Sequence, residues 1–223
     1  MPKVMVITGA SAGIGAATAR RAAAEGYRLV LAARTPGPLH ALAAELGALA
    51  VPCDIADWDQ VRSLVDRAVA EFGQLDVVFA NAGHSVVTSF ATDDCAPPEQ
   101  WRDMVLANVY GTAITAKATL PHLARSGGHL VLTGSAAGRG VRPGNLYSAT
   151  KWAVTGLAQN IRAEVTGVRV TLLQPGLVDT GGIPAHRATE PKLDPDDVAR
   201  AVLYAVAQPA HVNVDEVVIR PAG

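Results

Sequence analysis

Residues Val4–Gly15, with the sequence VMVITGASAGIG, decide how this 223-residue chain folds. The short apolar run at their start predicts a buried strand, and the alanine-rich residues from Gly13 onward predict a helix. A glycine turn between a strand and a helix lets backbone N–H groups at the helix N-terminus approach a phosphate. The glycine spacing is G-x-x-x-G-x-G. In this context it indicates a dinucleotide-binding turn, and a tight βα turn without a ligand is the alternative.

The alternation of apolar runs and longer helical stretches continues along the chain. Most runs are continuously hydrophobic, which is typical of parallel strands covered on both faces. We expect one α/β domain over residues 1–223, a Rossmann-type doubly wound parallel sheet of about seven strands flanked by helices, for dinucleotide binding and catalysis. The expected strands are Val4–Ile7, Arg28–Ala32, Ala48–Cys53, Leu75–Phe79, His129–Thr133, Val168–Leu173 and Glu216–Ile219. The expected helices are Gly13–Glu25, Pro38–Leu46, Trp58–Phe72, Trp101–Arg125, Ala149–Val165 and Pro195–Gln208.

Local signals support several of these boundaries. Asp57 is placed to cap one helix, which Gly73 ends, and Asp194 followed by a proline is placed to start the last helix. Residues Thr180–Leu193 lack periodicity and contain turn-forming residues, so we expect a loop there.

Composition and charge exclude several function classes. The net charge is −1, with no long run of one sign, which argues against nucleic acid or an anionic membrane as a partner. No segment reaches the ~18 consecutive apolar residues of a membrane helix. Cys53 and Cys95 have no metal-type spacing, so we expect reduced thiols and no metal site. These features favour a cytoplasmic protein.

The second strand ends at Arg34, in the run LAAR. Sites selective for NAD place an acidic residue here to bind the ribose 2′-hydroxyl. An arginine offers a cationic fork for a 2′-phosphate instead. The sequence therefore favours NADP(H), with NAD(H) possible, and a solvated surface arginine is the alternative.

A tyrosine and a lysine lie four residues apart in the run YSATK, and Ser135 precedes the tyrosine by twelve residues. Tyr147 and Lys151 would share one face of a helix. A neighbouring ammonium favours the phenolate, so we expect Lys151 to lower the pKa of Tyr147 and make it a general acid/base. The Ser135 hydroxyl follows a predicted strand, where it can bond a substrate oxygen. Such a pair is common by chance and gains its meaning from the other motifs.

Taken together, the motifs resemble those of the short-chain dehydrogenase/reductase family over essentially the whole chain. The matching runs are TGASAGIG, ANAG at residues 80–83, LANVYGT, TGSAAG, YSATK and PGLVDT at residues 175–180. The tail is similar to the branch that includes bacterial NADP-dependent hydroxy-acid dehydrogenases. Ala12 stands where many NADP-dependent members have a basic residue, which leaves the 2′-phosphate to Arg34 and Ser11.

The resemblance implies a role for individual residues. The catalytic residues would be Asn108, Ser135, Tyr147 and Lys151. It places Asp54 and Ile55 beside the adenine and Val178 and Thr180 at the nicotinamide carboxamide. It implies that Asn81–Gly83 steady the central sheet and line the adenosine ribose. The full set expected to bind the cofactor is Gly9, Ser11, Gly13, Ile14, Gly15, Arg34, Asp54, Ile55, Asn81, Ala82, Gly83, Tyr147, Lys151, Pro175, Gly176, Val178 and Thr180.

These observations predict an NADP(H)-dependent oxidoreductase that acts on a small-molecule carbonyl or alcohol. A sensor or scaffold that binds NADP(H) without turnover, and a carrier-protein-linked ketoacyl reductase, are the alternatives. Family members pair through the helices predicted at 101–125 and 149–165, which carry small and apolar residues on more than one face. We therefore expect a homo-oligomer, a tetramer or a dimer.

The substrate pocket is expected between His84 and Ser85, residues 136–145, Leu177 and the loop 181–187. Three basic residues near it, Arg142, His186 and Arg187, are candidates for binding an anionic substrate. The alternative is that they are solvated loop charges.

Overall fold

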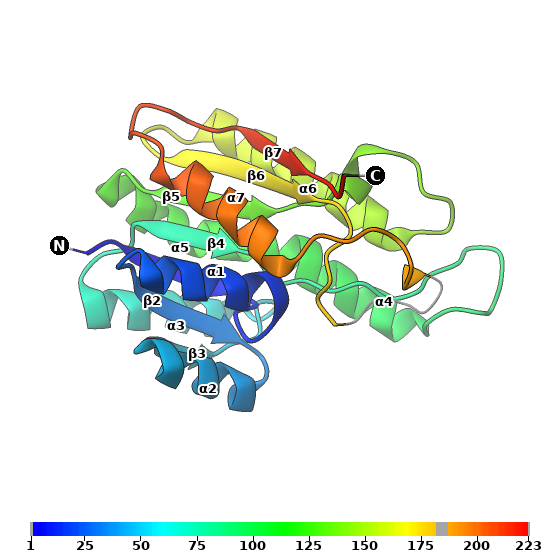
Figure 1. Ribbon diagram of the computed structural model, residues 1–223, viewed down its shortest axis with the longest axis horizontal. Helices are drawn as coiled ribbons and strands as arrows, with labels where there is room; N and C mark the ends of the chain where they lie inside the picture. The colour runs from blue at the N-terminus through cyan, green and yellow to red at the C-terminus, as the bar shows by residue number, and fades with distance from the viewer. Residues whose placement is uncertain (1, 182–186, 223) are drawn as a thin grey trace.

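The computed structural model describes residues 2–181 and 187–222, which form a parallel sheet with helices on both faces (Figure 1). The strand order is β3-β2-β1-β4-β5-β6-β7, and all neighbouring strands are parallel. The predicted fold class is confirmed. The strands are β1 (Val4–Thr8), β2 (Arg28–Ala33), β3 (Leu49–Pro52), β4 (Val77–Ala80), β5 (His129–Thr133), β6 (Arg169–Pro175) and β7 (Glu216–Ile219). The helices are α1 (Gly13–Ala24), α2 (Pro36–Leu46), α3 (Trp58–Phe72), α4 (Pro98–Val105), α5 (Thr112–Ser126), α6 (Leu146–Glu164) and α7 (Pro195–Ala207), with a π-helical turn η1 (Leu106–Gly111) and a 3-10 turn η2 (Ala136–Arg139).

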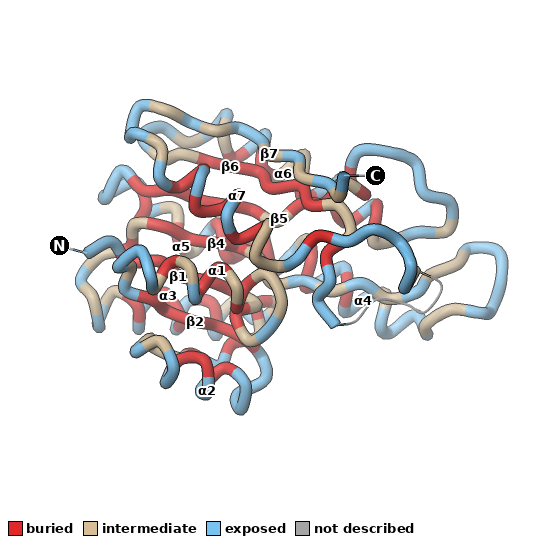
Figure 2. Tube along the Cα trace, in the orientation of Figure 1, coloured by how far each residue is buried: buried red, intermediate tan, exposed pale blue. Residues whose placement is uncertain are grey.

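The sheet divides the core into two layers. Met5 and Ile7 of β1 pack toward α1, α2 and α7, whereas Val4 and Val6 pack toward α3, α5 and α6. Successive residues of a strand point to opposite faces, so a strand covered on both faces must be apolar throughout. Figure 2 shows the result, with buried strands between helices whose outer sides are exposed.

The direction of winding reverses between β1 and β4. From β1 the chain runs outward to β2 and β3, then returns to place β4 on the other side of β1. In an open sheet of this kind the carboxyl ends of the two strands at the reversal border a crevice, where ligands bind. The fold thus brings the loops after β1 and β4 together.

Two helix predictions near the site need correction. The helix predicted at 149–165 is α6, which begins earlier because the Asn145 side chain accepts a hydrogen bond from the Ser148 N–H at 2.7 Å and caps it. Tyr147 therefore lies inside the helix. The helix predicted at 101–125 is instead the succession α4, η1 and α5. A π turn carries one extra residue, and hydrophobic periodicity alone does not reveal it.

The predicted caps are confirmed. Asp57 accepts hydrogen bonds from the N–H groups of the first turn of α3, and Gly73 ends that helix with a φ of 75°. Asp194 forms a reciprocal capping box with Asp197 at the start of α7. The loop predicted at 180–193 falls partly on residues 182–186, which lie outside the described residues. None of the helices in residues 2–181 and 187–222 combines the length and the hydrophobicity of a transmembrane helix.

Candidate active site

Three glycines shape the turn after β1. Gly9 and Gly13 have φ values of 66° and 51°, a region that residues with a Cβ rarely adopt. A Cβ on Gly9 would lie 2.8 Å from Ala82 Cα, and one on Gly15 would lie 2.2 Å from Gly9 O. The loop therefore packs against the residues after β4 without room for side chains. Its backbone is open to close approach by a phosphate.

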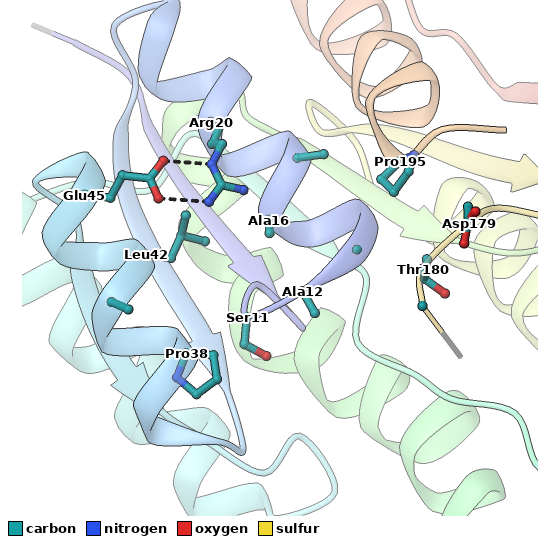
Figure 3. Close-up of a pocket in the computed structure, with 14 residues that line it drawn as sticks. Ser11, Ala12, Ala16, Arg20, Pro38, Leu42, Glu45, Asp179, Thr180 and Pro195 are labelled. Atoms are coloured by element: carbon teal, nitrogen blue, oxygen red, sulfur yellow. Dashed lines mark hydrogen bonds and ion pairs between the residues drawn. The ribbon is translucent and has the colours of Figure 1, made fainter. Parts of the chain in front are cut away.

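The N-terminus of α1 borders a cavity of about 600 Å³ (Figure 3). Ala12 stands at the N-cap and makes no side-chain capping hydrogen bond, so the first-turn N–H groups present positive potential there. Ser11 lines this end, Thr180 lies across from it, and the Arg20–Glu45 ion pair joins α1 and α2 at the far end. An uncapped helix N-terminus beside a cavity is a favourable place for a phosphate.

A network of hydrogen bonds between polar groups joins the ends of β1, β4 and β5. The Thr8 hydroxyl accepts hydrogen bonds from the Asn81 and Ala82 N–H groups at 3.0 and 3.1 Å. The Asn81 amide donates to Thr8 O at 3.1 Å, and its Oδ1 accepts from the Thr133 hydroxyl at 3.3 Å. The Asn81 side chain is thus engaged within the sheet. Its hydrogen bonds hold the ends of these strands in one arrangement.

The residues expected on the adenosine side follow β2 and β3. Ile55 is buried and lies so close to Gly111 that a Cβ there would meet its Cδ1 at 2.7 Å. The Asp54 carboxylate accepts from the Ala56 N–H at 2.9 Å, which fixes the turn. Arg34 is exposed, and its side chain has no hydrogen-bond or ion-pair partner among the described residues. Its positive charge, second to burial, lowers the pKa of His84.

The loop after β6 approaches the same crevice. The Gly176 N–H donates to Ile219 O at 2.7 Å, and Val178 forms a β-bridge with Leu193. Thr180 packs next to the glycine loop, because a Cβ on Gly13 would lie 2.9 Å from its Cγ2. These contacts place residues 175–180 opposite the N-terminus of α1.

Tyr147, Lys151 and Ser135 converge at the carboxyl edge of the sheet. The Lys151 ammonium lies 5.6 Å from the centre of the Tyr147 ring and donates to Thr133 O at 2.8 Å. Ser135 follows β5 and caps η2, where its Oγ accepts from the Ala137 N–H at 3.1 Å. The Ser135 hydroxyl also interacts with the Tyr147 phenol. A hydroxyl, a phenol and an ammonium therefore lie together at the carboxyl edge, where an open sheet of this kind forms a cleft for ligands.

Asn108 lies in the π turn η1 and is fully buried. Its amide donates to His84 O at 2.9 Å and to the Thr150 hydroxyl at 3.1 Å, and its Oδ1 accepts from the His84 N–H at 2.9 Å. A Cβ on Gly83 would lie 2.7 Å from Asn108 Oδ1 and 3.8 Å from Lys151 Nζ. Asn108 therefore joins the loop after β4 to α6, next to the lysine. π turns often occur at functional sites.

Burial dominates the electrostatics of this cleft. Burial raises the pKa of the Tyr147 phenol, while the interaction with Ser135 and the positive charge of Arg142 oppose the rise. The net depression that we expected from Lys151 is therefore wrong for this arrangement. Burial also lowers the pKa of Lys151 from 10.5 to about 8. At neutral pH the phenol is thus protonated and the lysine is mostly charged.

The residues predicted for the site come from the ends of strands β1 to β6 and the segments that follow them, and from η1 and α6. Ile14 is partly buried, and its side chain packs against the core. Thr8, Thr133 and Thr150 complete the network and were missed, since a threonine after a strand or within a helix carries no distinctive signal. His186 lies outside the described residues.

Comparison with known proteins agrees with this geometry. A family model described as short chain dehydrogenase matches residues 3–191. The chain belongs to the short-chain dehydrogenase/reductase family. An uncharacterized oxidoreductase of Staphylococcus aureus (strain USA300) is 41% identical, over 98% of this chain and 97% of the relative.

Solved structures of the family are similar over almost the whole chain. An alcohol dehydrogenase from the archaeon Thermococcus sibiricus, complexed with 5-hydroxy-NADP, has a TM-score of 0.88 and 34% identity, covering 99% of this chain and 97% of that one. A 3-ketoacyl-(acyl-carrier-protein) reductase from Brucella melitensis, complexed with NADH, has a TM-score of 0.88 and 29% identity, covering 98% and 96%. The family is that of oxidoreductases with a nicotinamide cofactor, so the protein is an enzyme of this class.

The buried ammonium of Lys151 predicts a specific pH dependence of stability. Because its pKa is about 8 in the folded protein and near 10.5 when unfolded, the unfolded chain binds more protons between these values. The free energy of unfolding of the wild type, relative to Lys151→Met, should therefore rise between pH 7.5 and pH 10. Urea titrations of both proteins at the two pH values measure this. An equal difference at both pH values would contradict a buried, displaced lysine.

Proposed function

We propose that this protein is an NADP(H)-dependent oxidoreductase that interconverts a carbonyl and a secondary alcohol by hydride transfer, with Tyr147 as the general acid/base. The observation that supports it most is the convergence of Tyr147, Ser135 and Lys151 at the carboxyl edge of the sheet. A phenol next to a hydroxyl and an ammonium is suited to exchanging a proton with a substrate oxygen.

The residues present fit a dinucleotide. The uncapped first turn of α1 and the crowded glycine loop suit the pyrophosphate, residues 54–55 and 82 suit the adenosine, and residues 175–180 suit the nicotinamide end. A bound nicotinamide supplies or accepts the hydride at the substrate carbon. Asn81 would act through the sheet rather than by direct contact, because its amide is already engaged.

The proton chemistry follows from the side chains of the cleft. Tyr147 donates its proton to the carbonyl oxygen as negative charge develops there, and Ser135 donates a hydrogen bond to the same oxygen. Since burial raises the pKa of Tyr147, the phenol is a proton donor at neutral pH. Reduction is therefore favoured there, and oxidation requires a higher pH. Lys151 keeps positive charge next to the phenol, and Asn108 fixes the backbone at His84.

Arg34 supports the preference for NADP(H). Its guanidinium is exposed at the end of β2 and unpartnered among the described residues, so it is free to bind a 2′-phosphate. Leu31–Ala33 before it offer no carboxylate for a ribose 2′-hydroxyl.

The two alternative functions are less well supported. A sensor without turnover has no need of a protonated phenol held against a serine. A carrier-protein partner would need a basic surface beside the cleft, and Arg139, one of the two arginines there, is already paired with Glu216.

We also propose that the protein is a cytoplasmic homo-oligomer. The outer side of α6 exposes half of Trp152, and η1, which packs against α6, exposes Leu106 and Tyr110. Apolar side chains gathered on neighbouring helices suit a contact between copies of the chain. The free cysteines Cys53 and Cys95 are compatible with a reducing compartment.

Replacing the phenol hydroxyl tests the mechanism. Tyr147→Phe removes the proton donor and should lower kcat by about 1000-fold or more. NADPH affinity, measured by quenching of its fluorescence, should change little, because the cavity at the glycine loop is untouched. Turnover of any carbonyl at the wild-type rate by this variant would rule the mechanism out.

Replacing the guanidinium tests the cofactor preference. Arg34→Ala should raise the KM for NADPH roughly tenfold and leave that for NADH nearly constant, since only NADPH carries the 2′-phosphate. The matched control is Arg125→Ala, which removes an exposed arginine at the end of α5. An equal rise in KM for NADPH and NADH would show that Arg34 does not discriminate between the two cofactors.

Placing a charge on α6 tests the assembly. Trp152→Glu should reduce the mass measured by light scattering after gel filtration, because a carboxylate cannot be buried unpaired in an apolar contact. Trp152→Phe keeps an apolar ring and should retain the wild-type mass. A monomeric wild type, or an unchanged oligomer in Trp152→Glu, would contradict the proposed contact surface.

A further inference from the structure

The residues before and after Tyr147 are each hydrogen-bonded to a different segment of the chain. The Ser148 hydroxyl donates to Ala137 O, in η2, at 2.6 Å. The Leu146 N–H donates to the hydroxyl of Thr88, in the loop after β4, at 2.9 Å. The first turn of α6, which carries the phenol, is therefore fixed by two segments that lie outside the helix.

The Thr88 hydroxyl makes two hydrogen bonds to this part of the backbone. It donates its proton to Gly144 O at 2.6 Å, and one of its lone pairs accepts from the Leu146 N–H. That N–H belongs to the first turn of α6, where backbone N–H groups have no partner within the helix. A Cβ on Gly144 would lie 3.6 Å from Thr88 O, so the backbone of the loop also lies against the turn.

The loop that carries Thr88 is itself anchored close to its start. The Asn81 N–H donates to the Thr8 hydroxyl at 3.0 Å, and the His84 N–H donates to Asn108 Oδ1 at 2.9 Å. Hydrogen bonds therefore connect the carboxyl ends of β1 and β4, through this loop, to the start of α6.

The phenol is sensitive to the placement of this turn because it meets a group on another segment. Tyr147 is the second residue of α6, and its phenol interacts with the Ser135 hydroxyl, which follows β5. Helix ends fray unless their first N–H groups find partners outside the helix. A displacement on the order of 1 Å can slow a reaction about 100-fold when it misplaces a reacting group.

We propose that Thr88 is a positioning residue, which holds the first turn of α6 so that the Tyr147 phenol faces the Ser135 hydroxyl. In this role Thr88 acts through the backbone at Gly144 and Leu146 and exchanges no proton with the substrate. The effect on rate rests on the proposed function, whereas the position of the phenol is measured without it. Thr88→Val keeps the shape of the side chain and removes both hydrogen bonds, and Thr88→Ser keeps the hydroxyl.

The first measurement follows the phenol and needs no substrate. Protein labelled with ¹³C at tyrosine Cζ gives NMR signals from its four tyrosines, and Tyr147→Phe identifies the signal of Tyr147. Thr88→Val should shift this signal, because the phenol loses its fixed contact with Ser135, and Thr88→Ser should keep the wild-type position. The matched control is Thr92→Val, since the Thr92 hydroxyl donates to Ser89 Oγ at 3.0 Å within the same loop. It should leave the signal in place. An unshifted signal in Thr88→Val would overturn the inference.

The second measurement is the rate of a single turnover of bound NADPH, which product release does not limit. The probes are 4-nitrobenzaldehyde and 2,3-butanedione, whose electron-poor carbonyls accept hydride readily. Thr88→Val should lower the rate about tenfold or more and leave the affinity for NADPH unchanged, because only the proton donor is displaced. Thr88→Ser and Thr92→Val should stay within about threefold of the wild type.

The outcomes separate the inference from the proposed function. A Thr88→Val protein with the wild-type rate would overturn the inference and leave the proposed function standing. A wild type that reduces no carbonyl compound with either cofactor would refute the proposed function, and the tyrosine signal would still decide whether Thr88 places the phenol.

Discussion

The hydrogen bonds between Thr8 and Asn81 are the constraint on which the site depends. It joins β1 and β4 where the winding of the sheet reverses, and it extends to β5 through Thr133. The glycine loop can approach Ala82 as closely as it does only because this junction is fixed. Thr133 also offers the carbonyl that holds Lys151, so the proposed cofactor and catalytic sites share one support.

Burial, rather than the contact between tyrosine and lysine, sets the charge state of the cleft. The low polarity that raises the pKa of Tyr147 also lowers that of Lys151. Both shifts disfavour charge, and for the phenol the interaction with Ser135 and the charge of Arg142 oppose the rise. A protein with this balance holds a neutral proton donor near a cation at neutral pH. That is the state required to reduce a carbonyl.

Several features were predictable from local sequence because their causes are local. Continuous apolar strands, the caps at Asp57 and Asp194 and the glycine turn each follow from a few adjacent residues. The start of α6 and the π turn were mispredicted, because Asn145 acts as a cap only in its folded turn and an extra residue in a helix leaves the apolar pattern nearly intact. The pKa of Tyr147 was misjudged, since spacing along a helix says nothing about burial.

The sequence by itself determined the sheet, the place of the glycine turn and the residue types of the proposed catalytic set, because hydrophobic pattern and motif spacing are properties of neighbouring residues. Only the tertiary structure decided which side chains are free to act. The Asn81 amide is hydrogen-bonded within the sheet, and Arg139 forms an ion pair with Glu216. The side chains of Arg34 and Arg142 have no partner among the described residues. The reason is that pairing and desolvation depend on residues far apart in the chain, which only folding brings into contact.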